Sequence, residues 1–230
     1  MKLACALFLT LLLTACGQQS SSPRQTAPPA QQQQQRSAAP TSEQGSFDYY
    51  VLSMSWSPQH CSTRGSNEPL QCAGERPYDF VLHGLWPQYE KGYPSDCTTD
   101  PIHRGAVDAM LDIMPNPALV RHEWKKHGTC SGMEPQEYFA KARQAFVSVK
   151  VPVQYQQPKV QVVSTPNEVR SRFVKDNPGF PKDSVAAVCS GRFLQEVRVC
   201  LTKDLKARAC SADVLRNQCR APEIILRPVR

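Results

Sequence analysis

Runs of apolar residues mark the strands of this chain. Residues 47–56 are aromatic, β-branched or otherwise apolar on both faces, which is typical of an interior strand. A second strand is predicted at 78–82 and should stop at His83-Gly84, where the apolar run ends. The remaining strands are predicted at 160–163, 185–189, 192–202 and 223–226.

Apolar positions spaced three and four residues apart predict three helices. The segment 118–127 is followed by Gly128, a suitable residue for the position after a helix end. A second helix at 134–149 has Pro135 in its first turn and an apolar stripe of Tyr138, Phe139, Ala142, Phe146 and Val149. A third, towards residue 175, opens with Thr165-Pro166-Asn167-Glu168, which resembles a capping box. This mixture predicts the α+β class, with a mostly antiparallel central sheet packed against helices.

The first 15 residues have the pattern of a bacterial export signal. Lys2 supplies a minimal positive start, and residues 3–13 form an apolar run too short to span a bilayer stably. The run ends in Leu13-Thr14-Ala15-Cys16-Gly17, which resembles a bacterial lipobox, where a cysteine is lipidated and becomes the mature N-terminus. We expect a signal peptide at 1–15, cleavage before Cys16, and a membrane-anchored protein of the periplasm or the cell exterior. A plain secretory signal, giving a freely secreted protein, is the alternative.

Composition divides the rest of the chain into two parts. Residues 16–46 consist mainly of Gln, Ser, Pro and Ala, so burial of apolar surface cannot offset their ordering entropy and a disordered tether is expected. Residues 47–230 suit a single domain with a sizeable core. The formal net charge of +7 is spread without a polybasic run, and it supports an anionic polymer as partner only weakly.

The ten cysteines favour an oxidising compartment. Signal cleavage would remove Cys5, and lipidation of Cys16 would occupy one more thiol and leave an even set of eight. None of the eight forms a Cys-x-x-Cys pair, which argues against zinc ribbons and thioredoxin-like redox chemistry. Cys61 and Cys72 fall in a predicted loop between the first two strands. Spacing alone leaves about 105 pairings of eight cysteines open.

The stretch with the most potential catalytic side chains is His122-Glu123-Trp124-Lys125-Lys126-His127-Gly128-Thr129-Cys130. A zinc metalloprotease helix carries histidines at i and i+4, but His122 and His127 are five residues apart. On a helix they would point about 140° apart, too far for two ligands of one zinc. Glu123 with His127, and His122 with Lys126, are four residues apart and share a face. Such a face suits acid/base chemistry on an anion; a metallohydrolase using His122, Glu123 and His127 is the alternative enzyme class.

A second stretch, His83-Gly84-Leu85-Trp86-Pro87, supplies another histidine. A strand that ends in His83-Gly84 places an imidazole at the edge of the sheet, where glycine permits close approach of a ligand. Trp86 offers a stacking platform for a nucleic-acid base.

Together these two stretches resemble the signature boxes of the ribonuclease T2 family, without a substitution in either. Upstream, Ser55-Trp56-Ser57-Pro58-Gln59-His60-Cys61 is similar to the family's first-strand element, although His60 stands where an aromatic residue is more usual. The resemblance runs from about residue 47 to the C-terminus. It implies an α+β fold and cleavage of single-stranded RNA by a monomer, with little or broad base specificity and with neither metal nor cofactor.

Such cleavage needs a base for the ribose 2′-hydroxyl, an acid for the departing 5′-oxygen and positive charge for the phosphorane. The resemblance implies that His127 is the base and His83 the acid, an order that the residues alone leave open. Lys126 would stabilise the phosphorane, and Glu123 would orient or charge-tune His127 and Lys126. His122 would contact phosphate or base. The expected products are 2′,3′-cyclic phosphates, which are then hydrolysed to 3′-phosphates.

The resemblance also implies a disulfide pattern and leaves one further hypothesis. The implied pairs are Cys61–Cys72, Cys97–Cys130, Cys189–Cys219 and Cys200–Cys210. A binding module that kept the fold but lost activity is the non-enzymatic alternative, and the presence of all four residues expected to act in catalysis argues against it.

Overall fold

The computed structural model describes residues 44–64, 68–74 and 76–230. The predicted signal peptide, the lipidation site Cys16 and nearly all of the predicted tether lie outside these residues, so the proposed division at 1–15, 16–46 and 47–230 stays a prediction. In the described part of the chain, no helix is long and apolar enough to cross a membrane.

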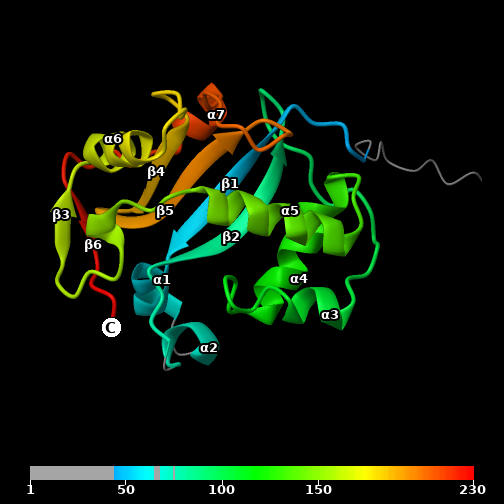
Figure 1. The fold of residues 1–230 in the computed structure, drawn as a ribbon, viewed down its shortest axis with the longest axis horizontal. Helices are drawn as coiled ribbons and strands as arrows, with labels where there is room; N and C mark the ends of the chain where they lie inside the picture. The colour runs from blue at the N-terminus through cyan, green and yellow to red at the C-terminus, as the bar shows by residue number, and fades with distance from the viewer. Residues whose placement is uncertain (1–43, 65–67, 75) are drawn as a thin grey trace, which may run out of the picture. The chain divides into compact units, whose positions relative to one another are not determined.

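Six strands form one twisted sheet (Figure 1) in the order β2-β1-β5-β6-β3, with β4 paired to β5 outside this path. The described strand pairs are antiparallel, except that β5 and β6 pair in parallel at one position. The strands are β1 (Tyr49–Trp56), β2 (Phe80–Gln88), β3 (Val162–Ser164), β4 (Val185–Ser190), β5 (Phe193–Leu201) and β6 (Ile224–Leu226).

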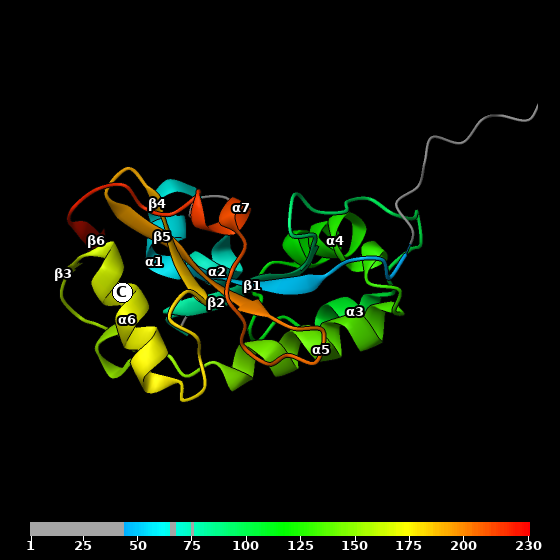
Figure 2. The ribbon, with the colours of Figure 1, turned by 90° about the horizontal axis from the view of Figure 1, so that it is seen from above.

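Helices cover both faces of this sheet. Figure 2 shows α3, α5 and α6 on one face and α7 on the other. The α-helices are α1 (Ser57–Arg64), α2 (Pro69–Cys72), α3 (Arg104–Asp108), α4 (Pro117–Lys126), α5 (Pro135–Ser148), α6 (Pro166–Asp176) and α7 (Ala212–Leu215). The described residues also form the 3-10 helices η2 (Gly128–Cys130) and η3 (Val153–Tyr155). The predicted α+β class with a mostly antiparallel sheet is confirmed.

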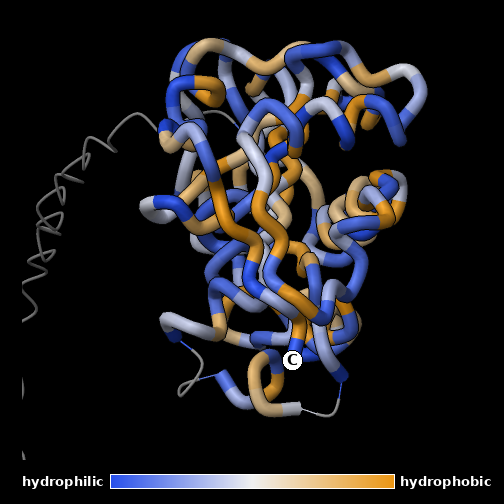
Figure 3. Tube along the Cα trace, turned by 90° about the vertical axis from the view of Figure 1, so that its left-hand side faces the viewer, coloured by the Kyte–Doolittle hydropathy of each residue, from blue (hydrophilic) through white to orange (hydrophobic). Residues whose placement is uncertain are grey.

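Side-chain alternation along β1 separates two apolar clusters. Its even-numbered side chains pack with α5 and α6 in the main core, and they are Tyr50, Leu52, Met54 and Trp56. The odd-numbered Tyr49 and Val51 belong to a smaller cluster with Cys200 of β5 and Val214 of α7. The most hydrophobic stretches accordingly run through the middle of this domain (Figure 3). Successive side chains of a strand point to opposite faces, so β1 serves both clusters.

One predicted strand end and one predicted loop are wrong. The second strand does not stop at His83-Gly84 but continues to Gln88, because β1 pairs with residues on both sides of a bulge: Gly84 pairs with Ser53, and His83 alone is left unpaired. The predicted loop with Cys61 and Cys72 contains α1 and α2, which local hydrogen bonds and the disulfide between these cysteines hold together. The short length of both helices and the glycine and asparagine between them obscure a helical pattern.

Local sequence explains both ends of α4. The Asn116 side chain accepts hydrogen bonds from the amides of Ala118 and Leu119, and Pro117 occupies the first helical position, where its missing N–H costs nothing. Gly128 follows the C-cap residue, as predicted, but it begins η2. A Cβ there would collide with the Trp124 ring, so close packing requires this glycine.

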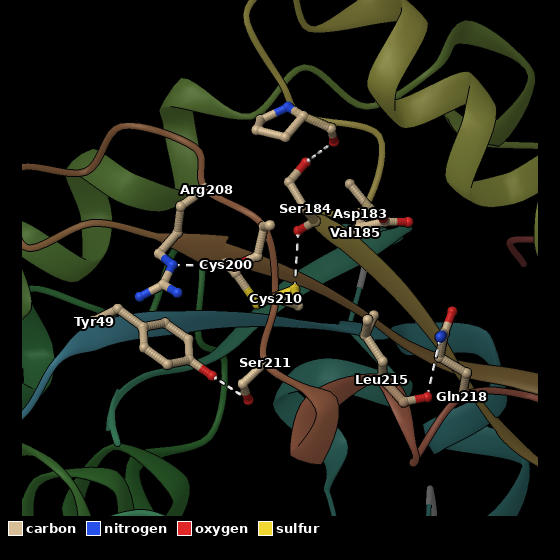
Figure 4. Close-up of a disulfide and its surroundings, with 12 residues drawn as sticks. Tyr49, Asp183, Ser184, Val185, Cys200, Arg208, Cys210, Ser211, Leu215 and Gln218 are labelled. Carbon is tan, nitrogen blue, oxygen red and sulfur yellow. Dashed lines mark hydrogen bonds between the residues drawn. A yellow bond between two sulfur atoms is a disulfide. The ribbon is translucent and has the colours of Figure 1, made fainter. Parts of the chain in front are cut away.

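Four disulfides hold the domain together: Cys61–Cys72, Cys97–Cys130, Cys189–Cys219 and Cys200–Cys210. These are the four pairs that the resemblance implies. Figure 4 shows the last of them, which ties β5 to the segment before α7. Beside it, the Tyr49 hydroxyl hydrogen-bonds the Ser211 hydroxyl at 2.8 Å. This linkage holds α7 against the sheet face opposite the main core.

Candidate active site

A cleft of about 710 Å³ lies on the α7 side of the sheet and collects side chains from β2, α4, β5 and α7. All six residues predicted to act in catalysis or substrate binding line it: His83, Trp86, His122, Glu123, Lys126 and His127. The structure therefore brings together two boxes that lie about 40 residues apart in the sequence.

A β-bulge in β2 directs His83 towards the cleft. The register with β1 shifts between Ser53 and Met54, which leaves His83 as an extra residue without a partner on β1. In a regular strand, His83 and Trp86 would point to opposite faces because they are three residues apart. The extra residue lets both line the cleft, which is a known use of bulges beside active sites.

His83 lies between two buried carboxyl groups. Its Nδ1 is 2.7 Å from Oε1 of Glu196, and its Nε2 is 3.6 Å from Oε1 of Glu123. Burial alone would lower the pKa of His83, but the hydrogen bond to Glu196 and the negative charges of Glu196 and Glu123 outweigh it and raise the pKa above its ordinary value. The surroundings therefore favour the protonated imidazolium.

Glu123 is fixed by the first box. It is 1% exposed, and its Oε2 accepts a hydrogen bond from the Trp86 indole N–H at 2.7 Å. Gly84 makes this contact possible, because a Cβ there would collide with Oε2 of Glu123 and with the indole nitrogen of Trp86. Burial raises the pKa of Glu123 to about 7, against the opposing effects of the His83 charge and the Trp86 hydrogen bond.

His127 has a different environment. It is the C-cap residue of α4, and its backbone N–H donates to the Glu123 carbonyl oxygen at 3.0 Å. The ring centroid lies 5.3 Å from that of Trp86 and 5.9 Å from that of Tyr93. Its Nδ1 is buried and has no hydrogen-bond partner in the described part of the chain. Burial, together with the positive charges of neighbours led by Lys126, lowers the pKa of His127 to about 3.

His122 and Lys126 form the wall of the cleft on the α4 side. His122 is exposed and Lys126 is half-buried. The Lys126 carbonyl oxygen accepts a hydrogen bond from the Asp96 amide at 2.9 Å, and the adjacent Cys97 is bonded to Cys130 just after the helix. The loop after the first box is therefore attached to the end of α4, which fixes where Lys126 and the following His127 lie.

The structure changes the predicted role of Glu123. We expected its carboxyl group to act on His127 and Lys126. It does interact electrostatically with Lys126, but it hydrogen-bonds Trp86 and lies beside His83. The reason is the helix end: α4 stops at Lys126, and His127, with φ of −120°, leaves the helical face that an i, i+4 pair requires.

Sequence reasoning missed Glu196 and Arg198 of β5. Glu196 is 3% exposed, and Arg198 donates two hydrogen bonds to its Oε2, at 2.9 and 2.7 Å. Burial would raise the pKa of Glu196, but the hydrogen bond and charge of His83, with the charge of Arg198, lower it to about 2. The available signal was a carboxylate and a guanidinium two residues apart, on one face of a strand that is otherwise mostly apolar.

Comparisons with known proteins identify the family of this chain. The model of the Ribonuclease T2 family matches residues 47–210. The chain belongs to this family. It is 36% identical over 200 residues to a ribonuclease of Aeromonas hydrophila, covering 82% of this chain and 89% of the relative. The predicted family and the predicted class of enzyme, a ribonuclease T2-like endoribonuclease, are thus confirmed.

Solved structures show the same fold. Trichomaglin, described as an S-like ribonuclease, superposes with a TM-score of 0.66 at 21% identity, covering 80% of this chain and 99% of the other. RNase NT in complex with 5′-AMP superposes with a TM-score of 0.62 at 20% identity, covering 80% and 99%. Within the described residues, no group of three or more His, Cys, Asp or Glu side chains is arranged to hold a metal ion.

Proposed function

We propose that this T2-family enzyme cleaves single-stranded RNA without a metal, by transphosphorylation to 2′,3′-cyclic phosphates and slower hydrolysis to 3′-phosphates. One observation carries the proposal: two histidines of one cleft have pKa values shifted in opposite directions, upward for His83 and downward to about 3 for His127. These opposite shifts favour an imidazolium at His83 and a neutral imidazole at His127, the pair that RNA transphosphorylation requires.

The first step uses both histidines at once. Neutral His127 takes the proton of the 2′-hydroxyl, whose oxygen attacks the adjacent phosphorus and forms the new P–O bond. Protonated His83 gives its Nε2 proton to the 5′-oxygen as the old P–O bond breaks. The products are a 2′,3′-cyclic phosphate and a free 5′-hydroxyl, and the two histidines have exchanged protonation states. Attack of water on the cyclic phosphate reverses these roles and yields the 3′-phosphate.

The remaining cleft residues act on charge and position. Lys126 lies beside His127, and its ammonium group stabilises the charge of the phosphorane. Glu123, close to His83 Nε2, orients that nitrogen and tunes its charge. His122, exposed on the cleft wall, contacts phosphate or base, and the half-buried Trp86 gives its accessible surface to a base.

Digestion of a mixed-sequence RNA with and without excess EDTA tests this proposal. Equal rates in both conditions and products with cyclic phosphate ends are expected. Loss of activity in EDTA would favour the metallohydrolase, and products with 5′-phosphate ends would exclude the 2′-hydroxyl as nucleophile. Absence of cleavage under any of these conditions would favour the binding module.

The lipid anchor at Cys16 and the monomeric state are separate proposals. The four disulfides support an extracytoplasmic location, because such bonds persist in oxidising compartments. Replacing Cys16 with Ser in the full chain should move the protein from the membrane fraction to the soluble fraction. Unchanged fractionation would favour the plain secretory signal. Size-exclusion chromatography with light scattering tests the monomer.

A further inference from the structure

One buried side chain that is not among the predicted site residues contacts His83 from the sheet: Glu196. Glu196 lies in the middle of β5, where Ser55 of β1 pairs with it on one side and Val188 of β4 on the other. Its side chain is 3% exposed, and its pKa of about 2 keeps it ionised at neutral pH. A buried carboxylate in an interior strand costs stability unless it is fully paired. This cost indicates that Glu196 has a function other than stabilising the fold.

The two oxygens of Glu196 have different partners. Oε1 is 2.7 Å from His83 Nδ1, while Oε2 accepts both hydrogen bonds of the Arg198 fork. The Arg198 guanidinium in turn lies 4.9 Å from the centre of the Trp86 ring, and Trp86 donates to Glu123. The carboxylate is thus held in one orientation, with one lone pair aimed at His83.

We propose that Glu196 is the positioning residue of the general acid: it holds Nδ1–H of His83 and thereby assigns the transferable proton to Nε2. An ionised carboxylate accepts hydrogen bonds only, so His83 keeps its Nδ1 proton in both protonation states. When His83 is neutral, Nε2 is bare and ready to be protonated again. A buried carboxylate serves the histidine of serine-protease triads in the same way. This inference rests on the proposed function, because it presupposes that His83 is the acid.

The charged and titratable groups around His83 come from two sides. Glu196 and Arg198 face it from β5; Glu123, and His127 at the helix end, face it from the α4 side. Glu196 and Glu123 favour the imidazolium, while Arg198 opposes it. Glu196 makes the short contact and is ionised, whereas the pKa of Glu123 is close to neutrality. Glu196 is therefore the carboxylate that stays ionised while His83 loses and regains its proton.

The test compares Glu196→Gln with Glu68→Gln in the full-length chain. Glu68 is a matched control, because it pairs with His60 at 2.6 Å outside the cleft. Nuclear magnetic resonance of the five histidines gives the titration of each ring. In Glu196→Gln the His83 titration should move to lower pH, and in Glu68→Gln it should not move.

Kinetics distinguish positioning of the acid from a merely structural role. In Glu196→Gln, kcat on RNA at neutral pH should fall by about 10- to 100-fold, a loss of the size found when the hydrogen-bond partner of a metal-ligating histidine is removed. The loss should shrink at acidic pH, where His83 is protonated even without Glu196. It should vanish on a substrate with sulfur in place of the bridging 5′-oxygen, because a thiolate leaves without an acid. Glu68→Gln should match the wild type in all three assays.

A second variant covers the case in which Glu196→Gln does not fold. Arg198→Gln removes a positive charge near His83, so the His83 titration should move to higher pH, opposite to the effect of Glu196→Gln. An unchanged His83 titration in both variants would overturn the inference. So would a Glu196→Gln loss that is equal at every pH and for both leaving groups. If the wild type cleaves no RNA, the proposed function fails, while the titrations still test the contact between Glu196 and His83.

Discussion

The two sides of the cleft shift the pKa values of their histidines in opposite directions. On the sheet side, His83 is hydrogen-bonded to an ionised carboxylate that an arginine holds in place. On the helix side, His127 is buried without a hydrogen-bond partner for Nδ1 among the described residues, and Lys126 adds a positive charge beside it. Both rings lose hydration, but only one gains a counter-ion. Burial lowers the pKa of both rings. At His83 the negative charge of Glu196 outweighs that effect, and at His127 no negative charge of the described residues does.

This comparison supports the proposed order of acid and base, which the two sequence boxes alone leave open. A buried histidine loses its proton unless an anion compensates for the lost hydration. Glu196 supplies that anion to His83, and α4 directs the Glu123 carboxyl towards His83 as well. Neither carboxyl group is among the neighbours that shift the pKa of His127, which supports the proposal that this ring is the base.

Removal of each histidine is expected to have the largest effect. His83→Ala and His127→Ala should each lower kcat on RNA by about 10²- to 10⁴-fold, the usual contribution of a general acid or base. The substrate with a sulfur leaving group separates them: it should restore most of the activity of His83→Ala and none of that of His127→Ala. Restoration of His127→Ala instead would reverse the assignment. Circular dichroism verifies that both variants fold.

Replacement of Lys126 is expected to cause the second-largest loss of activity. Lys126→Met removes the charge that we propose stabilises the phosphorane, and it should lower kcat by about 10²- to 10³-fold, comparable to the loss of one oxyanion donor. It should also raise the pKa of His127, because Lys126 helps to lower it. Lys125→Met is the matched control, since this neighbouring lysine is exposed and does not line the cleft. Equal losses in both variants would mean a general charge effect instead.

A smaller effect is expected at the glycine between His83 and Trp86. Gly84→Ala places a Cβ against Glu123 and Trp86, so it should lower the free energy of unfolding by about 1–3 kcal/mol, as overpacking does. Gly105→Ala on α3 is the control, because a Cβ there meets no atom within 4 Å. That change should be neutral or stabilise the helix by about 0.5–1 kcal/mol. Urea unfolding measures both. A stable Gly84→Ala variant would contradict the close packing around Glu123.

The sequence predicts which elements form and which residues line the site. It predicts less well which of these residues contact one another. Apolar periodicity located the longer strands and helices, and two intact boxes located six cleft residues. The bulge at His83 could not be predicted from the sequence, because it depends on the register between two strands. The partner of His83 was also missed, since Glu196 lies about 110 residues further along the chain and no local pattern connects the two. Tertiary structure alone determines which carboxyl group meets which histidine.

Titration of His83 and His127 by nuclear magnetic resonance, alongside the pH dependence of kcat, tests the central claim most directly. The predicted result is that His127 titrates well below the ordinary histidine pKa and His83 above it. Activity should then rise as His127 loses its proton, remain high through mildly acidic and neutral pH, and fall as His83 loses its own. Titration of His127 above His83 would contradict the account.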